Sequence, residues 1–293
     1  MGAHFDNDPL QLATLTTSPI AAAMGAEVPG IDLCRLTDEQ FADIETALYH
    51  HGLLVFRGQR LTHAVQESFT ERFGEHGTDA YTAGVPGHPN IQPVIREPGP
   101  ELPIFFGANW HTDSPFLDRP PAISMLRSVQ TPPYGGDTLY ASSRIAYQRL
   151  SPAYRRLLDG LQGLYTRSHL VRARQVWDAD PAIPFDLVAT EADLAGATRH
   201  PLVRTHPKTG AKSLFVDVNY TLGIDGLTRA EATPILRYLV EHITQPSFCC
   251  RIRWEPDMLA LWDNRLVLHQ AFDDYGDHRR EMYRSTVLGE VPA

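Results

Sequence analysis

The chain has 293 residues, of which 43% are hydrophobic and 21% charged, the composition of an ordinary soluble globular protein. Its formal net charge of -9 argues against a nucleic-acid or anionic-membrane partner, because both need a basic surface. The cysteines Cys34, Cys249 and Cys250 are odd in number and two are adjacent, which predicts a reducing, cytoplasmic compartment and no disulfide framework. The first residues lack the pattern of a signal peptide, and no run approaches the roughly 20 apolar residues that span a bilayer.

The N-terminal third predicts two helices around one buried strand. Thr37 is placed to cap a helix, with Gln40 at the reciprocal capping-box position and Gly52 at its end. The apolar run 53–56 predicts a buried strand, and residues 63–73 predict a second helix that ends at Gly74. Short strands joined by turns are expected within 20–33, where glycine and proline interrupt apolar residues.

The remainder of the chain alternates short strands with helices. Strands are expected at 91–96, 123–129, 138–140, 214–216, 248–254, 258–262 and 282–288, and helices at 143–150, 152–161 and 229–244. No linker or repeat divides the sequence, so we expect one domain over 1–293. Residues 76–108 and 165–200 have weak periodicity and are expected to be lid-like insertions over a site.

His111 and Asp113, in the middle of the chain, are the candidate centre of the molecule. On an extended segment both side chains project from one face. A second histidine, His269, follows the turn after the apolar strand 258–262. Two imidazoles and a carboxylate bind Fe(II) with open coordination positions, but they suit catalytic zinc as well. Any one of the 13 histidines taken alone is more often a core or surface residue.

Three separated motifs resemble a known family. They are, in chain order, His111-Thr112-Asp113, then Trp262-Asp263-Asn264-Arg265 before His269, and then Arg279-Arg280-Glu281-Met282-Tyr283-Arg284. In order and spacing they are similar to the taurine dioxygenase family of Fe(II)- and 2-oxoglutarate-dependent oxygenases, over about residues 20–290. The segment 110–121 resembles the aryloxyalkanoate branch that acts on (R)-dichlorprop.

The resemblance implies a role for each matching residue. His111, Asp113 and His269 would hold Fe(II), and Arg280 with Thr138 would hold the distal carboxylate of 2-oxoglutarate. An arginine suits that role because its planar guanidinium matches a carboxylate, which lysine cannot copy. A surface ion pair is the alternative for Arg280.

Substrate recognition is expected around Arg284. It lies four residues after Arg280, so the two side chains share one face of a strand, and two inward cations require anions. The resemblance gives Arg284 the acidic group of a small carboxylate or sulfonate substrate. Tyr220 matches a phenylalanine of the family's pocket. Tyr81 and Phe106 are expected to supply an apolar wall, and for each of these two an ordinary core aromatic is about equally plausible.

The fold expected is mainly β with flanking helices, around a double-stranded β-helix (jelly-roll) core. The activity expected is an Fe(II)-, 2-oxoglutarate- and O2-dependent oxidation of a small anionic substrate, in a chain that forms a homo-oligomer. Two alternatives stay open: a zinc hydrolase with the same His/Asp/His ligands, which leaves Arg280 unexplained, and a non-catalytic jelly-roll binding protein, which needs no complete ligand set.

Overall fold

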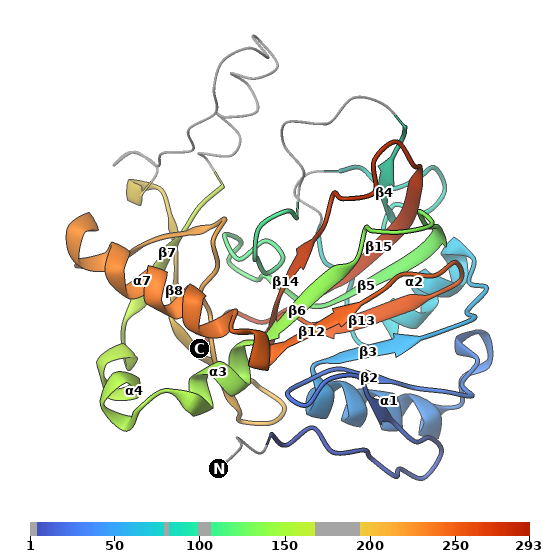
Figure 1. Ribbon diagram of the computed structural model, residues 1–293, viewed down its shortest axis with the longest axis horizontal. Coiled ribbons are helices and arrows are strands. Elements are labelled where there is room, and N and C mark those ends of the chain that lie inside the picture. Colours follow the sequence, from blue (N-terminus) through green and yellow to red (C-terminus); the bar gives the residue numbers. More distant parts are fainter. Residues whose placement is uncertain (1–4, 79–81, 99–106, 168–193) are drawn as a thin grey trace.

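Two β-sheets pack face to face in the computed structural model, which describes residues 5–78, 82–98, 107–167 and 194–293 (Figure 1). The larger sheet has seven strands in the order β1 (Ser18–Pro19), β2 (Ala26–Glu27), β3 (Leu53–Phe56), β13 (Leu259–Asp263), β5 (Pro121–Gln130), β15 (Arg280–Leu288) and β4 (Gln92–Arg96). The smaller sheet has three strands in the order β12 (Cys249–Ile252), β6 (Thr138–Ser142) and β14 (Val267–Ala271). All of these neighbouring strands are antiparallel except β2 and β3.

The alternation of side chains along β3 and β13 separates two apolar cores. Leu53 on β3 and Trp262 on β13 face the smaller sheet, where they pack with residues such as Tyr140. Leu54 and Leu261, one position away on the same strands, face the opposite side. Because successive side chains alternate, a strand buried on both faces is a continuous apolar run. Each fully buried side chain of this size contributes about 2 kcal/mol by leaving water.

Helices α1 (Asp38–His51) and α2 (His63–Glu71) cover the outer face of the larger sheet. The predicted capping box is present: Thr37 accepts from the Gln40 backbone, and the Gln40 side chain accepts from the Thr37 backbone. Gly52 then ends α1 with φ 73°, a left-handed conformation that glycine adopts without strain. The helix expected at 63–73 is shorter, since Arg72 already caps α2.

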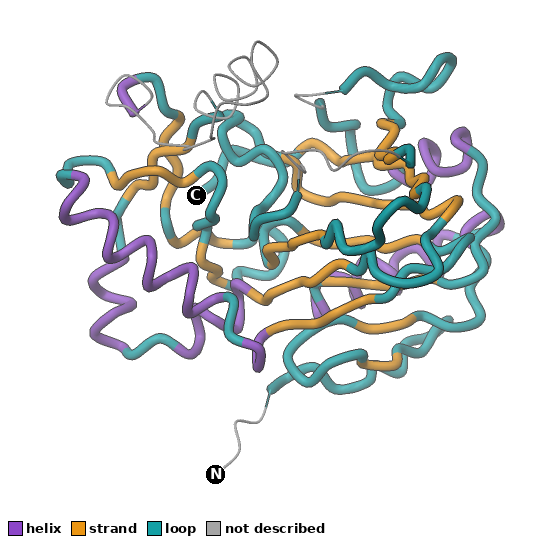
Figure 2. Tube along the Cα trace, turned by 45° about the horizontal axis from the view of Figure 1, so that its top comes forward, coloured by secondary structure: helices purple, strands orange, loops and turns teal. Residues whose placement is uncertain are grey.

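A second layer of helices and short strands lies at the other end of the molecule (Figures 1 and 2). An apolar core packs three helices of this layer, named in the next sentence, against the smaller sheet. It comprises α3 (Ser143–Arg149), α4 (Pro152–Leu158), α7 (Arg229–Ile243), the sheet β11 (Thr221–Ile224), β7 (Gln162–Tyr165) and β8 (Thr198–Pro201), and the hairpin β9 (Val203–Thr205) and β10 (Lys212–Leu214). Two short 3-10 helices, η1 (Leu33–Arg35) and η2 (Pro246–Phe248), complete the described elements.

Two sequence-based expectations in this region are wrong. The strand expected at 214–216 is instead Lys212–Leu214, because the Phe215 backbone turns away to bond Leu202 and Tyr165. The helix expected at 152–161 ends at Leu158, since strand β7 begins at Gln162. Most of the insertion expected at 165–200 lies outside the described residues, so its role stays a prediction. The mainly β architecture with flanking helices is as predicted.

All three cysteines are described, and none forms a disulfide. Within the described ranges, no helix combines the length and apolar character needed to cross a membrane.

Candidate metal centre and anion pocket

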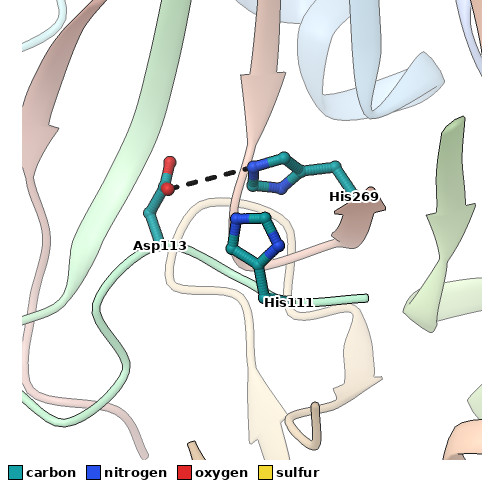
Figure 3. A group of neighbouring side chains, drawn as sticks. All are labelled: His111, Asp113 and His269. Atoms are coloured by element: carbon teal, nitrogen blue, oxygen red, sulfur yellow. Dashed lines mark ion pairs between the residues drawn. The ribbon is translucent and has the colours of Figure 1, made fainter. Parts of the chain in front are cut away.

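His111, Asp113 and His269 converge on one point between the sheets (Figure 3). One ligand atom from each residue lies within 4.8 Å of the ligand atoms of the other two, and all three side chains are buried. His269 is on strand β14, whereas the other two come from the segment that precedes β5. The three residues singled out in the sequence therefore lie together in the structure.

Backbone pairing fixes the two histidines side by side. The His111 amide donates to the His269 carbonyl at 3.0 Å, and the His269 amide donates to the His111 carbonyl at 2.8 Å. The Ala271 amide donates to the Gly107 carbonyl at 2.8 Å, which ties the preceding segment to the same strand. His111 forms one isolated bridge with His269, and the chain then turns at Ser114, whose φ is 44°.

Both imidazoles are prepared to act as neutral ligands. Nδ1 of His111 donates to the Asn109 carbonyl at 2.8 Å, which leaves Nε2 with its lone pair. Nε2 of His269 faces Asp113, 3.9 Å from Oδ1. Burial lowers the pKa of His111, and burial together with neighbouring His111 lowers the pKa of His269 to about 3. Neutral imidazole is the form that binds a metal ion.

Asp113 supplies the negative charge of the site. Burial alone would raise the pKa of this carboxyl, but Arg284, His269, His111 and the Ser124 hydroxyl together lower it to about 2. The carboxylate is therefore ionised at neutral pH. Two neutral imidazoles and one carboxylate from one side of a site form the facial donor set of non-haem Fe(II) oxygenases, and they also fit other divalent metals.

A buried arginine marks a second part of the site. Arg280 begins strand β15 and is 4% exposed. Its cross-strand neighbour Arg96 is paired with Asp273, but within the described part of the chain no carboxylate pairs with Arg280. The guanidinium lies 6.0 Å from the Trp254 ring, and the Trp254 indole donates to the Thr138 hydroxyl at 2.9 Å. Thr138 and Arg280 therefore both lie beside Trp254.

The buried polar atoms without a hydrogen-bond partner among the described residues include Arg280 Nε, His269 Nδ1 and the hydroxyls of Tyr140 and Tyr275. Both hydroxyls interact electrostatically with Arg280. Tyr140 is the cross-strand partner of His269 and stacks on its ring, with centroids 6.0 Å apart. Unpaired buried donors are costly unless a ligand satisfies them. This row of donors, running from a buried guanidinium toward the metal ligands, fits a small dianion.

The expected substrate residues are only partly placed. The Arg284 guanidinium lies 3.4 Å from Asp113 Oδ1, at the metal ligands. Tyr220 is buried and packs on Phe116, with ring centroids 5.2 Å apart. Tyr81 and Phe106 lie outside the described residues, so their role stays a prediction.

Several residues of the site were missed by the sequence analysis. Tyr140 lies two residues after Thr138, so strand alternation places both on one face and was the signal that could have found it. Asp217 accepts from the Thr112 amide at 3.3 Å, and Ser124 donates to Asp113. No pattern in the sequence marks these two, because their partners are far along the chain.

The chain is similar to known proteins over most of its length. The family model described as "Taurine catabolism dioxygenase TauD, TfdA family" matches residues 16–286. An alpha-ketoglutarate-dependent sulfate ester dioxygenase of Pseudomonas putida is 33% identical over 280 residues, which cover 95% of this chain and 91% of the relative.

Two further dioxygenases are similar to nearly the whole chain. An alpha-ketoglutarate-dependent 2,4-dichlorophenoxyacetate dioxygenase of Cupriavidus pinatubonensis is 30% identical over 297 residues, which cover 95% of this chain and 99% of the relative. Among solved structures, a taurine dioxygenase from Burkholderia xenovorans superimposes with a TM-score of 0.78 at 35% identity, covering 96% of this chain and 93% of the other.

Proposed function

Because the chain belongs to the taurine dioxygenase TauD/TfdA family, whose members use Fe(II), 2-oxoglutarate (alpha-ketoglutarate) and O2, we propose that it oxidises an unactivated C–H bond of a small anionic substrate. Hydroxylation is the expected outcome, with formation of succinate and CO2. Neither alternative from the sequence is favoured: the family is one of dioxygenases, and the Arg280 pocket has no purpose in a zinc hydrolase or in a binding protein without a co-substrate.

His111, Asp113 and His269 are proposed to hold the iron. The observation that carries this proposal is the convergence of their ligand atoms within 4.8 Å, with all three side chains buried. Iron and its 2-oxo acid, when bound, supply the activation of O2. The protein provides two neutral imidazoles and one ionised carboxylate, which leave half of an octahedral shell outside the protein ligands.

The co-substrate is proposed to bind between these ligands and Arg280. Its distal carboxylate would pair with the Arg280 guanidinium and the Thr138 hydroxyl, and the unpartnered hydroxyls of Tyr140 and Tyr275 support a ligand with further acceptor oxygens. Burial raises the pKa of Tyr140 well above its usual value, so this hydroxyl stays a donor at neutral pH. A buried guanidinium without an anion is strongly unfavourable, which favours an occupied pocket during turnover.

Substrate is proposed to dock against Arg284. The names of the relatives include a sulfate ester, a dichlorophenoxyacetate and taurine, and all three molecules carry an anionic group. Arg284 lies next to Asp113, so an anion held there would place its neighbouring carbons near the metal. The same proposal includes a jelly-roll core formed by the two sheets, in a single domain with lid-like insertions. It also includes membership of the aryloxyalkanoate branch and a cytoplasmic location.

An anaerobic titration tests the proposed activity. Wild-type protein with Fe(II) and 2-oxoglutarate should develop a weak visible charge-transfer band, and admission of O2 should then yield succinate. Small carboxylates, sulfonates and sulfate esters are added one at a time, and the substrate is expected to stimulate succinate release. Protein loaded with Zn(II) is the control and should give neither signal. Absence of both band and succinate with Fe(II) would contradict the proposed function.

A further inference from the structure

Three buried side chains, those of Trp262, Asn264 and Ser124, form a hydrogen-bonded relay that ends at Asp113. The Trp262 indole nitrogen donates to Asn264 Oδ1 at 2.9 Å, and Asn264 Nδ2 donates to the Ser124 hydroxyl at 2.8 Å. The Ser124 hydroxyl in turn bonds Asp113 Oδ2. The three residues come from β13, from the turn that follows it and from β5, and all are buried.

The direction of each hydrogen bond in this chain is forced. An indole N–H only donates, so the Asn264 oxygen must face Trp262 and the Asn264 amide nitrogen must face Ser124. Ser124 therefore accepts from Asn264, and its one hydroxyl proton is left to donate to Asp113. The relay cannot run in reverse, because Trp262 at its far end has no acceptor.

The consequence is that the two oxygens of Asp113 are not equivalent. Oδ2 accepts from Ser124, whereas Oδ1 faces the histidines and lies 3.9 Å from His269 Nε2. We propose, on the basis of the function proposed above, that Ser124 is a positioning residue that restrains Asp113 to bind the metal through Oδ1 alone. A carboxylate free to turn could bind through both oxygens and occupy a position that the chelating 2-oxo acid or O2 requires.

Asn264 also holds the neighbouring backbone. Its carbonyl accepts from the Thr112 hydroxyl at 3.1 Å, and its amide donates to the Ala122 carbonyl at 2.8 Å. The turn between β13 and β14 thus bonds Thr112, which lies between His111 and Asp113, while the Asn264 side chain acts through Ser124 on the Asp113 carboxylate. The same turn leads directly into the strand that carries His269, so one short segment positions all three ligands.

Replacement of one hydroxyl tests the proposal. Ser124→Ala removes the donor to Asp113, and Ser124→Cys keeps the volume with a weaker donor. Ser128→Ala is the matched control: Ser128 lies on the same strand and is equally buried, and among the described residues its hydroxyl bonds the backbone of Glu255 and Met258 alone. Both serine-to-alanine changes should lower the melting temperature of the metal-free protein by similar amounts, which separates stability from ligand geometry.

The readouts are the visible d–d spectrum of bound Co(II), and the affinity of the Co(II)-loaded protein for 2-oxoglutarate. Ser124→Ala should change the spectrum and weaken 2-oxoglutarate binding by about tenfold, with Ser124→Cys in between, while Ser128→Ala matches wild type. A Ser124→Ala protein with the spectrum and affinity of Ser128→Ala would overturn the proposal. A wild-type protein that binds Co(II) no better than His269→Ala would instead overturn the proposed function and the relay with it.

Discussion

Asp113 and Asp263 are two buried carboxylates, and they differ in how their oxygens are used. Oδ1 of Asp263 accepts from the Arg265 amide and Nε, at 2.9 and 2.8 Å. Oδ2 accepts from Arg265 Nη2 at 2.6 Å and from His206 Nε2 at 3.0 Å. Asp113, in contrast, has one oxygen bonded to Ser124, while the other faces two histidines and Arg284 at 3.4 Å or more.

This difference separates a structural carboxylate from a ligand. Burial would raise the pKa of both groups, and charged neighbours lower the pKa of both, so titration alone does not distinguish them. What distinguishes them is how fully their oxygens are bonded: Asp263 accepts four hydrogen bonds of 3.0 Å or less from Arg265 and His206. Among the described residues, Oδ1 of Asp113 has only the long 3.4 Å contact from Arg284 and faces the point that it shares with the two histidines. A buried acceptor that the fold leaves available is one that a ligand completes.

The largest expected effect comes from removing the open carboxylate. Asp113→Ala should reduce succinate formation by more than about a hundredfold, because the metal loses a charged ligand outright. Substrate-stimulated succinate release measures the loss, and the Fe(II)–2-oxoglutarate band should weaken in parallel. The free energy of unfolding of the metal-free protein should fall modestly, because Arg284 and Ser124 lose the carboxylate that they contact. Substantial product from this variant would mean that the ligand set is wrong.

Asp263→Asn should give the opposite pattern. The change keeps the shape but removes the charge that Arg265 and His206 share, and breaking a buried ion pair costs about 3–5 kcal/mol. Thermal or urea unfolding should show the loss, while the folded fraction still binds Co(II) with nearly wild-type affinity. If Asp263→Asn lost metal affinity as severely as Asp113→Ala, the division into a structural and a ligand carboxylate would not hold.

Arg280→Lys tests whether the anion pocket is built for a carboxylate. Lysine keeps the charge but not the planar fork, so 2-oxoglutarate should bind roughly tenfold more weakly. The measurement is the concentration of 2-oxoglutarate that gives the half-maximal charge-transfer band. The KM for the primary substrate should stay nearly unchanged. Unchanged 2-oxoglutarate binding would mean that Arg280 has a structural role and does not bind the co-substrate.

Arg284→Ala should separate the two arginines on β15. Its expected effect is about a tenfold rise in substrate KM, because one charge-assisted contact to the substrate anion is lost. The affinity for 2-oxoglutarate should be nearly unchanged, which the anaerobic titration measures directly. The reverse pattern, with weaker 2-oxoglutarate binding and an unchanged substrate KM, would exchange the roles assigned to Arg280 and Arg284.

The sequence predicted the features that depend on local chemistry or on separated motifs. Thr37 and Gln40 cap α1 as expected because a capping box involves residues only three apart. His111, Asp113 and His269 were found because each stands in its own recognisable context. The backbone arrangement at the first ligand could not be predicted, because His111 pairs with His269, a partner that periodicity cannot identify.

The relay behind Asp113 shows what sequence reasoning could not reach. Ser124 is one serine in an apolar strand, and nothing near it in the sequence suggests a ligand. Its role arises only when the sheet places β5 beside β13, with Ser124 paired to Trp262. Tyr140 is intermediate: alternation gives its face, but only the fold shows that its hydroxyl has no partner among the described residues.

His51 provides a second saturated cluster, outside the site. The Asn7 amide nitrogen donates to the Ala21 and Gly25 carbonyls, so Asn7 Oδ1 must accept from His51 Nδ1, at 2.6 Å. His51 Nε2 then accepts from the Thr17 hydroxyl at 2.8 Å. Both ring nitrogens are therefore satisfied in the neutral form, as both oxygens of Asp263 are satisfied in the charged form.

A further expected effect is the pH dependence that this cluster gives to stability. Burial lowers the pKa of His51 from 6.5 to about 3 in the folded chain. Below pH about 6.5 the unfolded chain therefore binds a proton that the folded chain does not, so the free energy of unfolding falls as the pH drops from there toward 3. His51→Gln should make this fall shallower in urea titrations of metal-free protein, although the variant is less stable at pH 7. An identical slope in both proteins would contradict the prediction, because it would mean that His51 binds a proton equally well in the folded and the unfolded chain.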